Sequence, residues 1–191
     1  MLRAHATGKC AESPLPARVR CAARGQEAVV VYRLEEETED DWWEVEALYD
    51  LCFAPGRTAL SSYRLREGVP TVAALCLTLR DESGALAAVI RYWPALVGGQ
   101  DVLLLGPVAV HPTRQGEGLG GLLINESLAE ARRLGWERVL LVGDAPYYGR
   151  FGFRKLEGVV MPPPTNPDRV LGLALKAGAW DKVTGAVTKA T

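Results

Sequence analysis

The hydrophobic pattern divides the chain into short β-branched runs, which predict strands, and longer segments with apolar residues three or four positions apart, which predict helices. Residues 29–32 predict the first strand. Thr38 can cap a first helix, because acids at 39–41 suit the positive end of a helix dipole. Residues 53–57 end that helix, and 61–67 predict a second, short one. The buried face of the first helix is predicted to be Val45, Leu48, Tyr49 and Cys52.

The middle of the chain predicts a hairpin followed by an interrupted strand. Residues 72–79 and 86–93 are both strand-like, and 81–84 supply turn residues between them. The next strand, 102–110, contains Gly106-Pro107. Proline cannot donate a hydrogen bond to a neighbouring strand, so this pair predicts a bulge or a local loss of pairing.

The last third of the chain predicts a long helix and several short strands. Residues 118–134 form the helix, 139–142 a short buried strand, and 146–150 a loop or single turn. Residues 151–153 lead into another strand, and 170–175 predict the final one. Together the segments predict one mixed α/β domain of about seven strands and about three or four helices. The buried face of the long helix is predicted to be Ile124, Leu128, Ala131 and Leu134.

Composition changes this picture little. Among 191 residues, 48% are hydrophobic and 24% charged, and the formal net charge is −1, so no basic field argues for nucleic acid or an anionic membrane. The longest apolar runs are strand-sized, so no membrane span is expected. Four scattered cysteines and two histidines offer almost no ligands for a metal site, and none is predicted. We expect reduced thiols and a cytoplasmic protein.

The first segment differs from the rest. Residues 1–27 are rich in arginine, with Glu12 and Glu27 their two acids, and contain two X-Pro pairs. We predict a disordered N-terminal extension there and a folded domain over 28–191. An organellar transit peptide and a start codon assigned too far upstream are the alternatives.

The segment after the interrupted strand carries the clearest chemistry. The strand turns through 111–114 into a glycine-rich run, 115–121, and then into the long helix. Glycines let the backbone approach a ligand closely, and the unpaired N–H groups of a first helical turn bind phosphate oxygens. Arg114 would add a charge-assisted contact. These residues predict a phosphate-bearing ligand at a helix N-terminus.

A dinucleotide site is the competing interpretation of the same glycines. Residues 116–121 satisfy G-x-G-x-x-G, and Asp144 follows a later strand at about the distance of a ribose-binding acid. However, five residues separate Val110 from Gly116, whereas the dinucleotide motif follows its strand almost directly. Too little chain follows for the remaining parallel repeats.

Three pieces of the segment 102–153 resemble the GNAT superfamily of acyltransferases. Gln115, Gly118 and Gly120 match its coenzyme-A motif, Q/R-x-x-G-x-G/A. Residues 105–112 are similar to the family's fourth strand and its exit, and 148–153 to its Y-x-x-x-G-F ending. Order and spacing agree over about fifty residues. Segments 53–57, 63–68, 143–148 and 173–175 are similar to one bacterial branch of predicted N-acetyltransferases of unassigned substrate.

The resemblance implies the acyl-CoA N-acyltransferase fold, a mostly antiparallel mixed sheet whose fourth and fifth strands splay apart. Pantetheine would enter that slot and pair with the backbone of Val108 and Val110, and the glycine loop would hold the pyrophosphate of acetyl-CoA. The residues assigned to acetyl-CoA in this way are Val108, Ala109, Val110, Arg114, Gln115, Gly116, Glu117, Gly118, Leu119, Gly120 and Gly121.

The same resemblance implies N-acetyl transfer to a primary amine, in which the amine attacks the thioester directly. Tyr148 occupies the family's general-acid position, and a tyrosine is protonated at neutral pH. The general base stays open between Asp144 and a water chain. A CoA-binding regulatory or scaffold module without turnover is the alternative function.

The sequence leaves the acceptor amine, the acyl-chain length and the oligomeric state undetermined. Small molecules and proteins both remain open as acceptors. Arg57, Arg64 and Arg66 either meet an anionic substrate or are solvated charges around a short helix. One of Trp42 and Trp43 could mark a homodimer contact.

Overall fold

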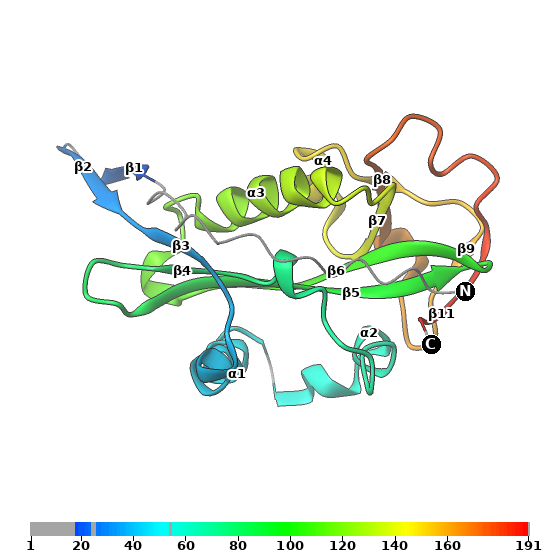
Figure 1. Cartoon of the computed structure of the whole chain (residues 1–191), viewed down its shortest axis with the longest axis horizontal. Coiled ribbons are helices and arrows are strands. Elements are labelled where there is room, and N and C mark those ends of the chain that lie inside the picture. The colour runs from blue at the N-terminus through cyan, green and yellow to red at the C-terminus, as the bar shows by residue number, and fades with distance from the viewer. Residues whose placement is uncertain (1–17, 24–25, 54, 191) are drawn as a thin grey trace.

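The computed structural model describes residues 18–23, 26–53 and 55–190, and within them a large mixed sheet carries helices on both faces (Figure 1). The helices are α1 (Trp42–Cys52), α2 (Ser61–Arg64), α3 (Leu119–Arg133) and α4 (Ala145–Gly149). The strands of the main sheet are β3 (Arg33–Glu36), β4 (Leu77–Arg80), β5 (Leu86–Val97), β6 (Gln100–Val110), β7 (Arg138–Val142), β8 (Arg154–Lys155), β9 (Val159–Val160), β10 (Val170–Ala174) and β11 (Gly185–Lys189).

The main sheet runs in the order β3-β4-β5-β6-β7-β10-β8, which confirms the predicted mixed, mostly antiparallel α/β architecture. Along this path the pairings are antiparallel except for β6 with β7, which is parallel. β11 pairs antiparallel with the far end of β5 and parallel with β9. This order excludes the doubly wound parallel sheet that the dinucleotide interpretation requires.

A separate hairpin precedes the sheet and projects from one end of the molecule in Figure 1. It consists of β1 (Arg18–Ala23) and β2 (Gln26–Val31). The first predicted strand, 29–32, therefore begins earlier than expected, and β1 falls inside the segment predicted as an extension. Residues 1–17 lie outside the described residues, so the boundary between residues 27 and 28 stays a prediction.

Two apolar clusters hold helices against opposite faces of the sheet. Figure 1 shows the sheet nearly edge-on, with α3 above it and α1 and α2 below. Ala88 and Ile90 of β5 point into the cluster under α3, whereas Val89 between them packs with Val45 and Tyr49 of α1. This alternation follows from the two-residue period of a strand.

Both long helices begin where their sequences predict. The backbone N–H and the hydroxyl of Thr38 donate to the carboxylate of Asp41 at 2.7 and 2.8 Å, which fixes a 3-10 turn ahead of α1. In α1, Val45, Leu48 and Tyr49 are buried as expected. In α3 the predicted face is correct except for Leu134, which follows the helix and is 42% exposed.

The interrupted strand contains the predicted bulge. On β5, Ile90 pairs with Val108 and Tyr92 with Leu105, so Arg91 alone faces the two residues Gly106 and Pro107. Beyond this point β6 separates from β7. The two strands pair only at Leu103 with Val139 and Leu104 with Leu140, which confirms the splayed pair.

Two predicted elements needed correction. Residues 73–75 form a 3-10 turn, so the strand predicted over 72–79 shortens to β4. β10 is not the last strand, because β11 follows it. The loop or single turn predicted over 146–150 is the short helix α4, which has five residues. Among the described residues no helix is long and apolar enough to cross a bilayer.

Candidate active site

The glycine run bends the chain sharply into α3. Gly116 and Gly118 have φ angles of 89° and 83°, a left-handed conformation that strains other residues. Gly118 is the residue immediately before α3. A Cβ atom at either glycine would meet nothing within 4 Å, so the space beside both is open. The N–H groups of the first turn of α3 are therefore accessible to a ligand.

A cleft of about 600 Å³ opens at this N-terminus, between β6, α3 and α4. It contains most of the residues that the sequence assigns to the cofactor, together with residues of α4 and its C-terminal side. Its walls are formed by Val108, Val110, Arg114, Gln115, Gly116, Gly118, Leu119, Gly120, Gly121, Tyr147, Tyr148, Arg150 and Phe151.

Ala109 and Glu117 are the two predicted cofactor residues that do not line the cleft. The side chain of Ala109 faces α1, because neighbouring residues of a strand point to opposite faces. The carboxylate of Glu117 accepts a hydrogen bond from the hydroxyl of Tyr32. Burial, and then this carboxylate, raise the pKa of Tyr32 to about 12.

The charges of the cleft differ from the sequence prediction. Arg114 lines it, but its guanidinium is 2.8 Å from Asp81 and 3.9 Å from Glu117, so acidic residues already neutralise much of its charge. Arg150 also lines the cleft and lies over the rings of Tyr147 and Phe151 at 4.5 and 5.6 Å. Sequence reasoning missed Arg150, although it lies within the Y-x-x-x-G-F motif.

Tyr148 sits where the cleft meets the gap between β6 and β7. Asp144 caps its helix by accepting the N–H of Tyr147 at 3.1 Å. The ring of Tyr148 packs edge-on against Tyr147 and Phe153, and burial raises its pKa to about 12. The phenol therefore stays protonated across the neutral pH range.

A small cavity of about 130 Å³ occupies the gap itself. Leu104, Gly106 and Val108 of β6 line one side, and Leu141 of β7 lines the other. Because Val108 and Tyr148 also line the cleft, this cavity adjoins it. We call this cavity the slot.

A cavity of about 400 Å³ lies on the other face of the sheet, between α1 and α2. It shares Arg57, Tyr63, Arg66 and Pro107 with the slot. We call it the second cavity. Its full lining is Glu46, Tyr49, Arg57, Thr58, Tyr63, Arg64, Arg66, Glu67, Arg91, Trp93 and Pro107.

Two arginines of the second cavity are held by acids. Arg57 contacts Glu46 and Asp50 at 2.7 and 2.8 Å. Arg91 contacts Glu37 at 2.5 Å and Glu46 at 2.7 Å. Glu46 therefore bridges both guanidinium groups and ties α1 to β5.

The remaining candidates lie away from the three cavities. Asp144 is exposed and acts as the cap of α4. His111 is also absent from the cavity walls, and its ring nitrogen bonds Thr113 at 2.8 Å within its own turn. Within the described part of the chain, no group of three metal-binding side chains occurs.

Comparison with known proteins agrees with this geometry. A model of the acetyltransferase (GNAT) family matches residues 31–153, more than half of the chain. The chain is 35% identical over 88 residues to the Escherichia coli uncharacterized N-acetyltransferase YjhQ, covering 44% of this chain and 49% of that protein. For E. coli YhbS the identity is 33% over 81 residues, covering 41% and 48%. The chain thus spans about half the length of the curated relatives it matches.

Solved structures match over more of the chain. The E. coli YhbS structure in complex with CoA has a TM-score of 0.74 at 25% identity and covers 87% of this chain and 94% of that one. A GNAT acetyltransferase of Brucella melitensis in complex with acetyl-CoA has a TM-score of 0.61 at 30% identity, covering 84% and 96%. The chain therefore belongs to the acetyltransferase (GNAT) family.

Proposed function

We propose that this protein is an N-acetyltransferase that moves an acetyl group from acetyl-CoA to a primary amine. The observation that carries the proposal is the meeting of the glycine loop, the unpaired edge of β6 and Tyr148 around one cleft. Two structural relatives hold CoA or acetyl-CoA, which supports this donor.

In this proposal the first turn of α3 holds the pyrophosphate. The N–H groups of the loop other than that of Glu117, which donates to the carbonyl of Arg114, would bind the phosphate oxygens, and the helix dipole favours negative charge there. Arg150 adds a positive charge that no described acid neutralises. The backbone of Val108 and Val110 pairs with the pantetheine amides, in place of the strand that β7 no longer supplies.

The reaction then takes place in the slot. The neutral amine attacks the thioester carbonyl, the new C–N bond forms, and the C–S bond breaks as the amine nitrogen loses one proton to solvent water. A backbone N–H near Val108 polarises the carbonyl oxygen. Tyr148 protonates the departing thiolate and recovers its proton from solvent, and the raised pKa of Tyr148 keeps that proton available. Asp144 is absent from the walls of the slot, so we do not propose it as the base.

Calorimetric titration with acetyl-CoA and CoA, with NADH as the control ligand, tests the proposal. We expect saturable binding of both CoA ligands and none of NADH. Gly118→Trp fills the open space beside the loop and should weaken binding at least about tenfold, or about 1.4 kcal/mol. A folded wild-type protein that binds neither CoA ligand would contradict the proposal. Binding without turnover on any amine would favour the regulatory or scaffold module.

A further inference from the structure

Arg66 connects the second cavity to the slot. Its side chain lines both, and its guanidinium lies between two aromatic rings, 4.7 Å from the centre of Tyr63 and 4.7 Å from that of Trp93. A Cβ atom built at Gly106 would be 3.6 Å from its Nη2 atom, so the guanidinium reaches the bulge of β6. Arg66 therefore lies beside the point where β6 and β7 part.

Among the described residues, this guanidinium contacts no carboxylate, unlike its two neighbours. Nε and Nη1 of Arg66 are buried from solvent and have no hydrogen-bond partner among the described residues. Arg57 and Arg91 each contact two carboxylates. Burial lowers the pKa of Arg66 to about 10, whereas the pKa values of the two paired arginines are raised.

An unpaired buried charge is costly, because the low-dielectric interior replaces the water that would solvate it. The two aromatic rings offset part of this cost through cation–π attraction, and the Tyr63 hydroxyl counteracts part of the lowering of the pKa of Arg66, but Nε and Nη1 have no hydrogen-bond partner among the described residues. The position is therefore suited to a ligand that brings its own negative charge and oxygen atoms.

We propose that Arg66 binds an anionic group of the acceptor, and that the acceptor is a small amine with a carboxylate or phosphate close to its nitrogen, such as a free amino acid. The inference rests on the proposed acetyl transfer. Because Arg66 reaches the bulge beside the slot, only a short spacer can separate the anion from the reacting amine. A protein lysine or a polyamine would leave this guanidinium unpaired.

The wild-type protein allows a test from the substrate side. The enzyme is incubated with acetyl-CoA and one amine at a time, and the N-acetyl product is measured by mass spectrometry. The amines are free L-amino acids, each compared with its methyl ester and its decarboxylated amine, and O-phosphoethanolamine, compared with ethanolamine. We expect kcat/KM for one acid class to exceed that of its neutral analogue by about 10- to 100-fold, the range of charge-assisted hydrogen bonds. The carboxylate and phosphate pairs identify which anion is preferred. Equal rates for the acids and their neutral analogues would overturn the inference.

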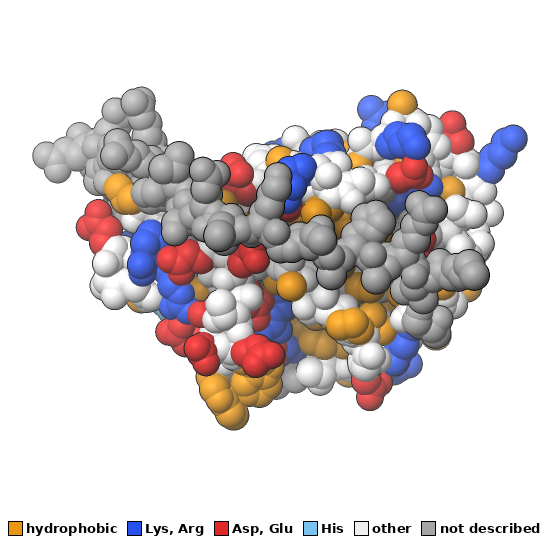
Figure 2. Space-filling model, in the orientation of Figure 1, with side chains coloured by type: hydrophobic (Ala, Val, Ile, Leu, Met, Phe, Trp, Pro, Cys, Tyr) orange, Lys and Arg blue, Asp and Glu red, His pale blue; other side chains and the backbone are white. Residues whose placement is uncertain are grey.

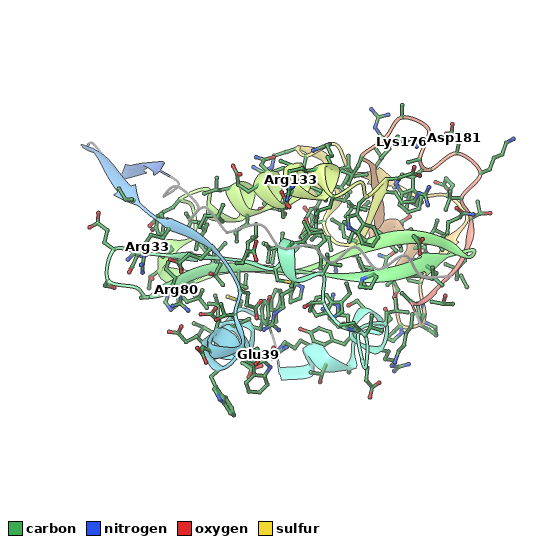
Figure 3. The ribbon with its side chains drawn as sticks, viewed as in Figure 1. Arg33, Glu39, Arg80, Arg133, Lys176 and Asp181 are labelled. Carbon is green, nitrogen blue, oxygen red and sulfur yellow. The ribbon has the colours of Figure 1, made fainter. Side chains whose placement is uncertain are left out.

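Three variants separate recognition from folding. Arg66→Met keeps the packing between the rings and should remove the preference for the acid, while its melting temperature stays equal to or above that of the wild type. Arg66→Lys should restore part of the preference. Arg133→Met is the matched control, since Arg133 is exposed on α3 across the sheet from α2 (Figure 3).

Acetyl-CoA titration distinguishes this inference from the proposed function. We expect wild type and Arg66→Met to bind acetyl-CoA equally, so a loss confined to the acid substrates belongs to the acceptor site. An unchanged preference in Arg66→Met would overturn the inference. The inference would also be overturned if no anionic amine of the panel is acetylated and none raises the melting temperature of the CoA-bound wild type.

Discussion

At the scale of single residues, Tyr148 is the proposed general acid. Its ring is mostly buried, and its place at the junction of the cleft and the slot puts a proton donor beside both. The raised pKa means that the phenol does not ionise until pH approaches about 12. A loss of activity between pH 8 and about 10 would therefore have another origin.

We predict that Tyr148→Phe lowers kcat by about 100-fold, the lower range for general acid catalysis, and leaves the affinity for acetyl-CoA unchanged. We expect kcat/KM to rise with pH in both the wild type and the variant, because the acceptor amine must lose a proton before it attacks. Steady-state rates from pH 6 to about 10 and calorimetry of both proteins provide the check. A variant with the wild-type kcat would exclude Tyr148 as the acid.

Gly143 determines where the ring of Tyr148 can lie. A Cβ atom at Gly143 would lie 2.7 Å from Cδ2 of Tyr148 and 2.8 Å from Leu141, both far inside van der Waals contact. Gly143→Ala should therefore displace the tyrosine and reduce kcat about as much as Tyr148→Phe does. Gly149→Ala is the control, because a Cβ there meets nothing within 4 Å. Full activity in Gly143→Ala would contradict this steric argument.

At the scale of residues, the sequence predicts a site residue most readily when that residue belongs to a motif of neighbouring positions. Gln115, Gly118, Gly120 and Tyr148 belong to contiguous motifs, and the structure brings them to one cleft as predicted. Arg66 lies in segment 63–68, but the resemblance of that segment assigns it no role, and the sequence left it open between contact with an anionic substrate and a solvated charge. Its importance depends on Trp93 and on the missing carboxylate, and both are consequences of tertiary packing.

At the scale of secondary structure, the long periodic helices and the short apolar strands β7 and β10 were predictable, whereas the shortest strands were not. α1 and α3 show helical spacing and capping residues over several turns. β8 and β9 have two residues each, and β11 forms because it can pair with β5 and β9. Such short strands depend on tertiary pairing, so a single segment carries almost no signal for them.

The short helix α4 depends on its cap. It has five residues, too few to be stable alone, and Asp144 satisfies one of its free N–H groups. We predict that Asp144→Ala destabilises the protein by about 1 kcal/mol in urea unfolding and lowers kcat through Tyr148, whereas Asp144→Ser retains most of both. Equal stability of the Ala variant and the wild type would show that the cap contributes nothing.

At the scale of the whole molecule, one acid links the helical layer to the sheet. Glu46 on α1 contacts Arg57 and Arg91, and its removal would leave both guanidinium groups with fewer anions in a mostly buried setting. We predict that Glu46→Gln lowers the free energy of unfolding by about 1 to 3 kcal/mol. Glu67→Gln is the control, since Glu67 is exposed and 3.9 Å from Lys189, and should cost less than about 0.5 kcal/mol.

An exposed apolar patch bears on the oligomeric state of the whole molecule. Figure 2 shows a hydrophobic patch at the lower tip, over α1, where Trp42 and Trp43 are 47% and 77% exposed. The two rings meet edge-on, and their centres are 4.4 Å apart. The homodimer contact suggested by these tryptophans stays a prediction, which the sedimentation of wild type and Trp43→Ser would check.

The splayed strands give the molecule two entrances. The cleft opens on the face of the sheet that carries α3, the second cavity opens on the face that carries α1 and α2, and the slot shares lining residues with both. Two reactants arriving from opposite faces need not displace one another, and neither must leave before the other enters. Double-reciprocal plots at several concentrations of the second reactant should therefore intersect, as for a ternary complex, and not run parallel, as for a covalent acetyl-enzyme.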